Sequence, residues 1–378
     1  MKIAAPWMAA SATRDVMAAL ASAGHVALYV GGCVRNTILG APTGDIDIAT
    51  DGHPGAVMSA LEEAGIKAIG TGIDHGTVTA VARGLPHEIT TFRRDVETDG
   101  RRATVAFSTR IDEDAARRDF TMNALYADAD GTVLDPTGQG LSDLAARRLR
   151  FIGRAADRIA EDRLRILRYF RFHAWYADPE AGFDPDDLAA IADAQDRLAD
   201  LSRERVGHEM RRLLAAPDPA PALATMARVG VLARVVPGAE THALAPLIAD
   251  EARLGIAPSW PRRLVALGGD DVDEALRLSR AEARALALLR EGLDGTDGPA
   301  TLGYRIGAEA ARDVLVLRGG AKPADVSEAE FAAAAEFPIR ATDLMPALSG
   351  PALGERLAEL EARWIASGFN LSRDDLLR

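Results

Sequence analysis

Two aspartates separated by one residue, Asp45 and Asp47, are the first candidates for chemistry in this chain of 378 residues. They border a short apolar run that we expect to form a strand, and side chains two apart in a strand project from the same face. Carboxylates held this close repel each other unless a cation lies between them, and Mg²⁺ prefers such oxygen ligands. The spacing therefore predicts a magnesium site, with a solvated surface pair as the alternative.

Glu88 is the candidate for a third carboxylate. It lies in a run, residues 88–92, that we expect to form a strand able to lie beside the strand of the two aspartates. Many sites that transfer phosphoryl groups with two metal ions use a third carboxylate. We therefore assign Glu88 to the catalytic set with Asp45 and Asp47. An exposed residue at a strand edge is the alternative.

A glycine pair, Gly31 and Gly32, precedes the aspartates and separates an expected strand from an expected helix. Such a turn lets the backbone approach a phosphate closely, and the first amide groups of a helix point toward an anion. Arg35 lies within the first turn of that helix and adds a fixed positive charge. We therefore expect Gly32 and Arg35 to contact a nucleotide, whereas an ordinary turn is the alternative.

Paired arginines form a second motif, Arg117-Arg118-Asp119, which is followed by an apolar run that contains Asn123. Arg118 either pairs with Asp119 in a structural ion pair or reaches the triphosphate of a nucleotide, and we assign it to the nucleotide-binding set. The polar, glycine-containing segment before this motif, residues 93–102, is expected to form a loop over the site.

Arginines recur at every third position in the third motif, after an aspartate: Asp162, Arg165, Arg168 and Arg171. On an α-helix these residues would spread around about half of the circumference over about 13 Å, a length that suits a nucleoside triphosphate. The base would lie at the Asp162 end and the phosphates at the end of Arg168 and Arg171. A helix with internal ion pairs at spacings of three and four residues is the alternative.

The first two of these residues suit particular bases. Asp162 only accepts hydrogen bonds and Arg165 only donates them. Cytosine and adenine each present an exocyclic amine beside a ring acceptor, so both match the pair. Guanine and uracil place a carbonyl opposite the carboxylate, which is repulsive. The motif therefore predicts a protein surface that selects cytosine or adenine without a nucleic-acid template.

The elements that must position these residues change character near residue 150. Before it, short β-rich runs alternate with helical ones; after it, apolar residues recur at helical spacing. We therefore predict an α+β protein, with an N-terminal head built on a small mixed β-sheet and helices, followed by an all-helical remainder. The expected strands are 26–30, 46–49, 77–82, 88–92 and 125–127, and the clearest expected helices are 34–39, 54–64, 163–175, 186–201, 220–229 and 272–289.

Composition limits the classes of function. The net charge is −12, so a nucleic-acid partner would need a local basic surface, and residues 144–175 hold nine arginines against three acidic residues. The single cysteine excludes a disulfide framework. No apolar run approaches the roughly 20 residues that span a bilayer, and the N-terminal segment lacks the sustained apolar core of a signal peptide. We expect a cytoplasmic protein with no membrane partner.

Together the motifs resemble those of class II tRNA nucleotidyltransferases, the family of bacterial and eukaryotic CCA-adding enzymes and the related bacterial poly(A) polymerases. Four motifs occur in the same order within about residues 24–175: Gly31-Gly32-x-Val-Arg, Asp45-x-Asp47, Arg117-Arg118-Asp119-Phe-Thr-x-Asn-Ala-Leu and Glu161-Asp162-x-x-Arg-x-Leu-Arg-x-x-Arg-Phe. The resemblance implies Mg²⁺ at Asp45 and Asp47. It also implies nucleotide contacts from Gly32, Arg35, Arg118, Asp162, Arg165, Arg168 and Arg171. Asn36 departs from the family, which usually has Asp there.

The resemblance also implies an architecture and an activity. We expect a catalytic head at residues 1–150, a helical neck with the nucleotide-selecting helix at 151–215, and a helical body and tail for RNA binding at 216–378. The implied activity is the addition of CMP and AMP, from CTP and ATP, to the 3′ end of tRNA, with release of pyrophosphate. The alternatives are addition of CC only, A only or poly(A), and a catalytically inactive RNA-binding relative.

Overall fold

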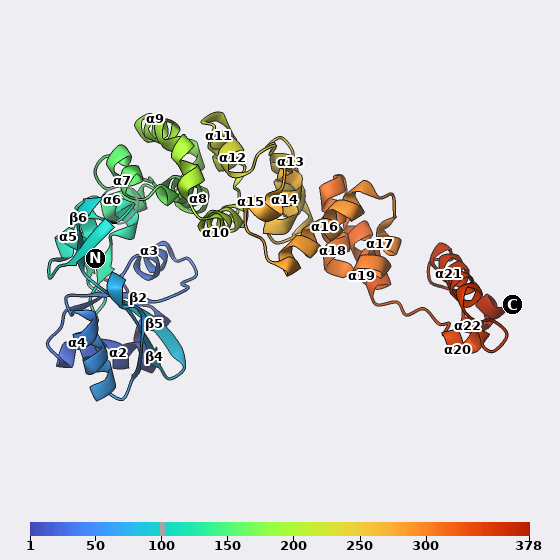
Figure 1. Ribbon diagram of the computed structural model, residues 1–378, viewed down its shortest axis with the longest axis horizontal. Helices are drawn as coiled ribbons and strands as arrows, with labels where there is room; N and C mark the ends of the chain where they lie inside the picture. The colour runs from blue at the N-terminus through green and yellow to red at the C-terminus, as the bar shows by residue number, and fades with distance from the viewer. Residues whose placement is uncertain (99–102) are drawn as a thin grey trace. The chain divides into compact units, whose positions relative to one another are not determined.

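The computed structural model describes residues 1–98 and 103–378, and it places a mixed β-sheet with helices in the N-terminal part and helices after it (Figure 1). The predicted α+β class is confirmed. The chain divides into two compact units. Unit 1 comprises Met1–Ser202 and the separate segment Arg228–Arg234, and unit 2 comprises Arg203–Ala227 and Val235–Arg378.

The seven-stranded sheet of unit 1 has the order β3-β4-β5-β2-β1-β8-β9, and a second, two-stranded sheet pairs β6 with β7. Only β2 and β5 pair in parallel; the other neighbouring strands of the described chain are antiparallel. The strands are β1 (Ala27–Val30), β2 (Asp47–Thr50), β3 (Lys67–Gly72), β4 (Thr77–Ala82), β5 (Leu85–Thr91), β6 (Arg93–Thr98), β7 (Ala103–Phe107), β8 (Tyr126–Ala127) and β9 (Val133–Leu134).

Helices of unit 1 cover the sheet and continue beyond it. The helices α2 and α4 pack against each other and against β4 (Figure 1). The helices up to Ser202 are α1 (Pro6–Ala9), α2 (Ser11–Ser22), α3 (Gly32–Leu39), α4 (Pro54–Glu63), η1 (Ile73–His75), α5 (Ile111–Ala116), η2 (Thr121–Asn123), α6 (Gly140–Ala145), α7 (Ala155–Glu161), α8 (Leu164–Tyr176), η3 (Pro179–Ala181), α9 (Pro185–Ala194) and η4 (Gln195–Asp200).

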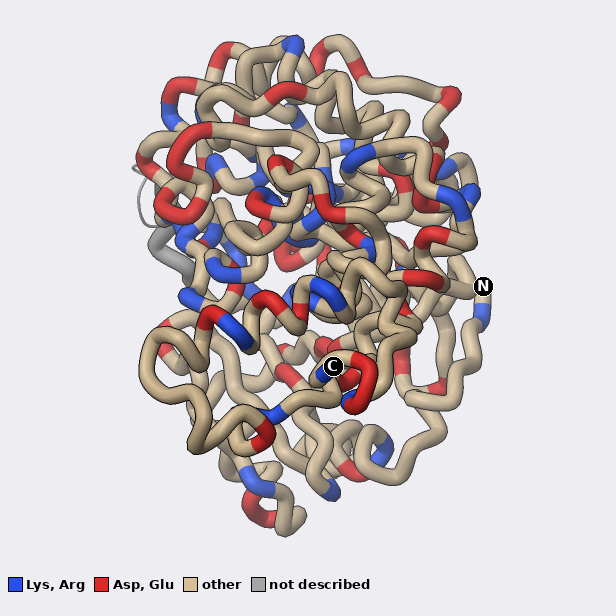
Figure 2. The backbone as a smooth tube through the Cα atoms, turned by 90° about the vertical axis from the view of Figure 1, so that its right-hand side faces the viewer, with Lys and Arg blue, Asp and Glu red and all other residues tan. Residues whose placement is uncertain are grey.

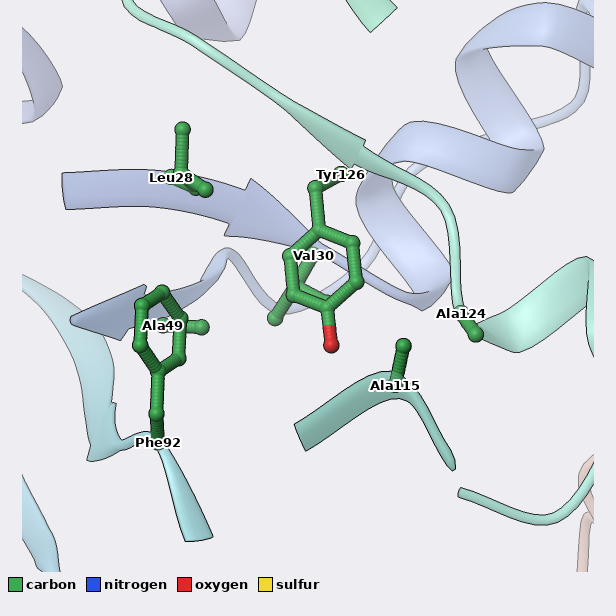
Figure 3. Close-up of a cluster of buried hydrophobic side chains, with 7 residues drawn as sticks. All are labelled: Leu28, Val30, Ala49, Phe92, Ala115, Ala124 and Tyr126. Atoms are coloured by element: carbon green, nitrogen blue, oxygen red, sulfur yellow. The ribbon is translucent and has the colours of Figure 1, made fainter. Parts of the chain in front are cut away.

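A buried cluster joins the centre of the sheet to the helices that carry the second motif. It contains Leu28, Val30, Ala49, Phe92, Ala115, Ala124 and Tyr126. Figure 3 shows the ring of Tyr126 filling the cluster while its hydroxyl points toward the helix that carries Ala115. That hydroxyl donates a hydrogen bond of 2.7 Å to Asp114 Oδ2 in the same helix. The apolar core therefore ends at a polar group that belongs to the site.

Several predicted strands occur where they were expected, and three differences have physical reasons. Strand β4 has the predicted limits, whereas β3 was missed because most of its residues are exposed and it contains two glycines. Residues 93–98 and 103–107 form a hairpin instead of the predicted loop; residues 99–102 lie outside the described part. Strand β8 lies within the predicted strand 125–127, whereas β9 was missed because two residues are too few to show a period.

The helices after Ser202 include one predicted helix that is divided. Residues 272–289 form α15 and the start of α16, because Arg277 has a φ of +48° and Ser279 begins a new helix with a capping box to Glu282. The helices are α10 (Arg203–Leu214), α11 (Ala220–Arg228), α12 (Val231–Val235), α13 (Leu244–Leu254), α14 (Trp260–Leu267), α15 (Val272–Ala275), α16 (Arg280–Asp294), α17 (Pro299–Ile306), α18 (Ala308–Arg318), α19 (Pro323–Ala333), α20 (Ala341–Leu344), α21 (Pro351–Ala366) and α22 (Arg373–Leu377).

A buried ionic cluster connects four helices of unit 2. Glu251 in α13 accepts hydrogen bonds from Arg262 and Arg263 in α14, at 2.6 Å in each case. Arg262 also pairs with Asp313 in α18, and Arg263 donates to the carbonyl oxygen of Leu214 in α10 at 2.7 Å. Both arginines are completely buried, so their charges depend on these acceptors.

Charged residues are spread along the whole described chain. Figure 2 shows acidic and basic residues interleaved along the tube instead of gathered into long stretches of one sign. Within residues 1–98 and 103–378, no helix combines the length and the apolar composition needed to cross a bilayer.

Candidate active site

The glycine pair forms the junction between β1 and α3. Gly31 has a φ of +72°, a backbone conformation that favours glycine, and Gly32 begins the helix. A Cβ atom at Gly31 would lie 3.8 Å from Arg118 Nη1 and 3.7 Å from the carbonyl oxygen of Asn123. The turn that was predicted to receive phosphates therefore lies next to the second motif.

The three predicted carboxylates gather where the start of β2 lies beside the middle of β5. Asp47 is the first residue of β2 and pairs in register with Glu88 of β5, while Asp45 lies two residues before the strand. Burial, repulsion from Glu88 and repulsion from Asp45 raise the pKa of Asp47 to about 6, although Arg118 acts in the opposite direction. The expected adjacency of Glu88 and the aspartate strand is therefore present.

The carboxylates of Asp45 and Asp47 fit a Mg²⁺ site in which water and substrate phosphates supply the other ligands. In the described chain no group of three or more His, Cys, Asp or Glu side chains is arranged to hold a metal ion on its own. Mg²⁺ is usually bound through one or two carboxylates together with water and substrate phosphates, so a complete protein cage is not required. Burial is the largest cause of the raised pKa of Asp47, and a cation would relieve the repulsion from Glu88 and Asp45 that adds to it.

Arg118 is held by the carboxylate of Asp114 and the hydroxyl of Tyr126. Its Nη2 donates to Asp114 Oδ2 at 2.9 Å and its Nε donates to the Tyr126 hydroxyl at 3.0 Å. Asp114 also accepts a hydrogen bond of 3.0 Å from Arg117 Nε and is only 1% exposed. Burial alone would raise the pKa of Asp114, but the charges of Arg118 and Arg117 lower it to about 2. The structural partner of Arg118 is therefore Asp114, and not its neighbour Asp119.

Asp119 instead joins the second motif to the arginine helix α8. Arg168 donates to Asp119 Oδ2 through Nε at 2.7 Å, and its Nη2 forms an ion pair with the same oxygen at 2.5 Å. Oδ1 of Asp119 accepts hydrogen bonds from Asn123 Nδ2 at 2.9 Å and from the amide of Phe120 at 2.8 Å. Burial opposes ionisation, yet Arg168 and these donors lower the pKa of Asp119 to about 2. Arg168 is therefore held in place by a permanently charged group.

The other residues of the third motif differ in part from the expectation. Asp162 was expected on the arginine helix, but it has extended backbone before α8, and its carboxylate accepts from the amide of Leu164 at 3.1 Å. The N-cap residue of α8 is Arg163, so Asp162 lies one residue before the cap. Arg165 donates to Glu161 and to the carbonyl oxygen of Arg117 (2.7 Å), and Arg171 is buried against Phe172. Arg165 thus forms the ion pair that the alternative describes, and its contact with a base stays a prediction.

Arg35, for which a nucleotide contact was predicted, is buried. It is 6% exposed, and burial lowers its pKa. Its guanidinium donates to Asn36, Asn123 and Tyr176, the last at 2.8 Å.

Sequence reasoning missed Asp114 and Tyr176 as parts of the site. Asp114 precedes Arg117 by three residues and Arg118 by four, a helical spacing that favours ion pairs and that was available in the sequence. Tyr176 is separated from Arg35 by 141 residues, so no local pattern indicates their contact.

Comparisons with known proteins identify relatives of this chain. A family model described as "Poly A polymerase head domain" matches residues 27–150, and one described as "Probable RNA and SrmB- binding site of polymerase A" matches residues 182–242. The mouse mitochondrial CCA tRNA nucleotidyltransferase 1 is 31% identical over 373 residues, which cover 93% of this chain and 86% of that protein. The human counterpart is 43% identical over 191 residues, which span 50% of this chain and 44% of the human protein.

A solved structure covers nearly the whole chain. The CCA-adding enzyme of Bacillus stearothermophilus in complex with CTP has a TM-score of 0.77 and 29% identity, and it covers 96% of this chain and 94% of its own. Fold and site thus define a nucleotidyltransferase. Within that class, the chain belongs to the family of class II tRNA nucleotidyltransferases that contains the CCA-adding enzymes.

Proposed function

We propose that this chain adds CMP and AMP, from CTP and ATP, to the 3′ end of tRNA without a nucleic-acid template. The observation that carries the proposal is the grouping of three carboxylates, in which the charges of Asp45 and Glu88 act on Asp47. Arg118 also acts on Asp47, and its guanidinium lies next to the glycine turn. Membership of the family and the similarity to a CTP complex support it.

The proposed mechanism assigns a role to each part of the site. Asp45 and Asp47 would hold Mg²⁺, which when bound lowers the pKa of the RNA 3′-hydroxyl and neutralises phosphate charge. The amide groups at Gly32 and the side chain of Arg118 would bind phosphates of the nucleotide, so that the hydroxyl attacks the α-phosphate in line and pyrophosphate leaves. Glu88 would add negative charge beside Asp47.

The third motif would orient the nucleotide. Arg168 and Arg171 lie on α8 and would complete the binding of the triphosphate, while Asp162 and Arg165 would face the base. If this is so, Asp162→Ala should relax discrimination against UTP and GTP while Arg165 is intact. Incorporation assays with the four nucleotides measure this, and an unchanged preference for CTP and ATP would count against the assignment.

The test of the proposed activity uses tRNA that ends before CCA, with CTP and ATP supplied singly and together. We expect two C residues with CTP alone and a complete CCA end with both, and loss of activity in Asp47→Asn. The matched control is Asp130→Asn, an exposed turn residue. Arrest after CC, addition of A alone or long adenosine tails would favour the related activities. Absence of pyrophosphate release with Mg²⁺ would favour an inactive RNA-binding protein.

Two further assignments accompany this proposal. The proposed architecture has a head at 1–150, a neck at 151–215, and a body and tail at 216–378 that bind RNA. The proposed compartment is the cytoplasm; because the human and mouse relatives have mitochondrial names, cell fractionation is the direct test.

A further inference from the structure

The sheet of unit 1 is covered by helices on one face and is more open on the other. The helices α2 and α4 pack against β4, and α4 also packs against β3 (Figure 1). His87 of β5 is buried and forms a hydrogen bond of 3.0 Å with Thr13 of α2. Since neighbouring residues of a strand point to opposite faces, Glu88 points away from these helices, and its side chain is exposed.

Strand register continues the row of carboxylates across the open face. Asp47 of β2 pairs with Glu88 of β5. Glu88 also pairs with Thr79 of β4, which in turn pairs with Ile69 of β3. Side chains that are opposite each other in neighbouring strands lie on the same face. Strands lie about 4.8 Å apart, so the row extends about 14 Å from Asp47 to Ile69. This is the length of about four stacked nucleotides, at about 3.4 Å each.

Threonine hydroxyls and one apolar side chain form the surface beyond the carboxylates. The hydroxyls of Thr71 and Thr79 share a hydrogen bond of 2.9 Å, and those of Thr77 and Thr90 share one of 3.4 Å. Ile69 is 39% exposed. Hydroxyl groups can contact phosphate and sugar oxygens without reading the base sequence. These five residues, Ile69, Thr71, Thr77, Thr79 and Thr90, are named here the threonine face.

The charge of these strands suits a polyanion. The chain has a net charge of −12, yet the described strands β3, β4 and β5 contain a single acidic residue, Glu88. Lys67 is exposed and lies two residues from Ile69 in β3, so it belongs to the same face. Within these three strands, Glu88 is therefore the only side chain that would repel a phosphate.

The groups proposed to bind the nucleotide lie on the opposite side of the carboxylates. Gly32 follows β1, and Arg118 donates to the Tyr126 hydroxyl of β8. In the sheet, β1 lies on the side of β2 away from β5, and β8 lies beyond β1. In-line transfer places the attacking hydroxyl and the leaving pyrophosphate on opposite sides of the α-phosphate. The side of β5, β4 and β3 is thus left for the RNA.

We propose that the threonine face binds the sugar–phosphate backbone of the last nucleotides of the RNA acceptor and directs its 3′ end to the carboxylates. This inference rests on the proposed nucleotidyl transfer, which places the nucleotide on the side of β1. The threonine hydroxyls contact phosphates and riboses, and Ile69 contacts a base. Contacts of this kind fix the position of a strand whatever its sequence.

A negative charge on the threonine face should weaken binding of the RNA and not of the nucleotide. We expect Ile69→Glu to raise the KM for tRNA at least tenfold, because like charges then oppose each other, and to change the KM for CTP less than threefold. Leu85→Glu is the matched control: Leu85 is 51% exposed but lies two residues before His87, on the side of the helices. It should change neither constant. Equal KM values for tRNA in the two variants would overturn the proposal.

Thr79 offers a variant that adds no charge. Thr79→Val keeps the shape of the side chain and removes its hydroxyl, so we expect the KM for tRNA to rise about fivefold with the KM for CTP unchanged. Thr79→Ser retains a hydroxyl and should return the KM for tRNA to within twofold of the wild type. An unchanged KM for tRNA in Thr79→Val would contradict the proposal.

Photocrosslinking locates the RNA without any transfer reaction. tRNA that ends before CCA, with 4-thiouridine at each of its last three positions in turn, is irradiated with the protein in EDTA without CTP or ATP. Mass spectrometry should find the crosslinks in peptides of β3 and β4, with a lower yield in Ile69→Glu and an unchanged yield in Leu85→Glu.

Two results of these measurements would overturn the proposal. One is crosslinking confined to other elements. The other is a dimer of the wild-type protein that Ile69→Glu dissociates, because a second copy of the chain would then cover the threonine face. If the crosslinks fall on β3 and β4 but the wild-type protein adds no nucleotide, the proposed function is wrong and the RNA surface is retained.

Discussion

Single carboxylates organise the site by holding more than one basic or polar group each. Asp114 accepts from Arg117, Arg118 and Tyr126, and it lies almost completely out of contact with solvent. Asp119 plays the same part for Arg168 and Asn123. The arginines that we propose to meet the nucleotide are therefore placed by acidic residues that do not meet it.

Removal of Asp114 should be strongly destabilising. We expect Asp114→Ala to lower the free energy of unfolding by about 3 kcal/mol, because loss of one partner leaves buried cationic groups uncompensated. Urea denaturation measures the change. Asp112→Ala, which removes a surface carboxylate paired with Arg110, is the matched control and should leave the midpoint unchanged. Equal effects of the two variants would contradict the structural role of Asp114.

Acid should lower the stability of unit 1 by protonating Asp114 and Asp119. The pKa of Asp114 and that of Asp119 are about 2 in the folded chain, against 3.8 for an ordinary aspartate, so the unfolded chain binds protons first. Their stabilisation, about 2 kcal/mol each, is complete above about pH 4 and is lost as the pH falls toward 2. Denaturation curves between pH 5 and 2 should show this loss of stability, and the stability of Asp119→Asn should fall less steeply with pH. An identical pH dependence of the two proteins would argue against a stabilising role of ionised Asp119.

Mg²⁺ should stabilise the folded chain by relieving the repulsion among Asp45, Asp47 and Glu88. Without nucleotide we expect Mg²⁺ to raise the melting temperature of the wild-type protein and not that of Asp47→Asn. In EDTA the variant should melt above the wild type, because it no longer repels Asp45 and Glu88. Calorimetry with EDTA or Mg²⁺ tests both statements, with Asp130→Asn as the control. A Mg²⁺ response retained in Asp47→Asn would place the ion elsewhere.

Close packing of helices depends on a glycine at one contact in unit 2. The helices α17 and α19 approach so closely that a Cβ atom at Gly303 would lie 2.0 Å from the carbonyl oxygen of Ala329. The backbone of one helix would have to move to accept a side chain there. By contrast, Gly354 in α21 has no atom within 4 Å of such a Cβ position.

The two glycines should therefore respond to alanine with opposite signs. Gly303→Ala is expected to cost about 2 kcal/mol of stability through overpacking. Gly354→Ala should stabilise by up to about 1 kcal/mol, because alanine is the better helix former. Thermal melts of both variants give the comparison, and stabilisation by Gly303→Ala would show that α17 and α19 are not in contact.

Elements with a strong local pattern could be predicted from the sequence, and those defined by distant partners could not. Strand β4 alternates buried and half-buried residues and has the predicted limits, and the glycine turn lies between a strand and a helix as expected. The break between α15 and α16 depends on a capping box that the apolar period conceals. Asp162 also follows a helical period but lies between α7 and α8 with extended backbone, which the period does not reveal.

In the candidate site, too, residues with a local pattern could be predicted, and pairings between distant residues could not. The types and spacing of Asp45 and Asp47 indicated a carboxylate site, and the pairing with Glu88 agrees with the expected neighbouring strand. The sequence did not indicate which carboxylate each arginine would pair with. Arg168 and Asp119 are 49 residues apart, and the choice between pairing and nucleotide contact depends on burial that only the folded chain determines.

Over the whole molecule, the division into two units predicts that their stabilities can be changed separately. Glu251 compensates two completely buried arginines of unit 2. Glu251→Gln should accelerate hydrogen exchange at least tenfold in peptides of α13, α14 and α18, with peptides of β2, β5 and α8 unchanged. Glu309→Gln, an exposed residue of α18, is the control. Equal acceleration in both units would mean that they unfold as a single cooperative block.

The short segment Arg228–Arg234 belongs to unit 1, although it follows 25 residues of unit 2 in the chain, Arg203 to Ala227. During synthesis, therefore, the sheet and the arginine helix emerge from the ribosome well before their unit is complete. Domains tend to fold in order as they emerge. Here the first unit must wait for translation of a piece of the second, so a ribosome that stalls near residue 220 would expose a nascent catalytic part still lacking its last segment.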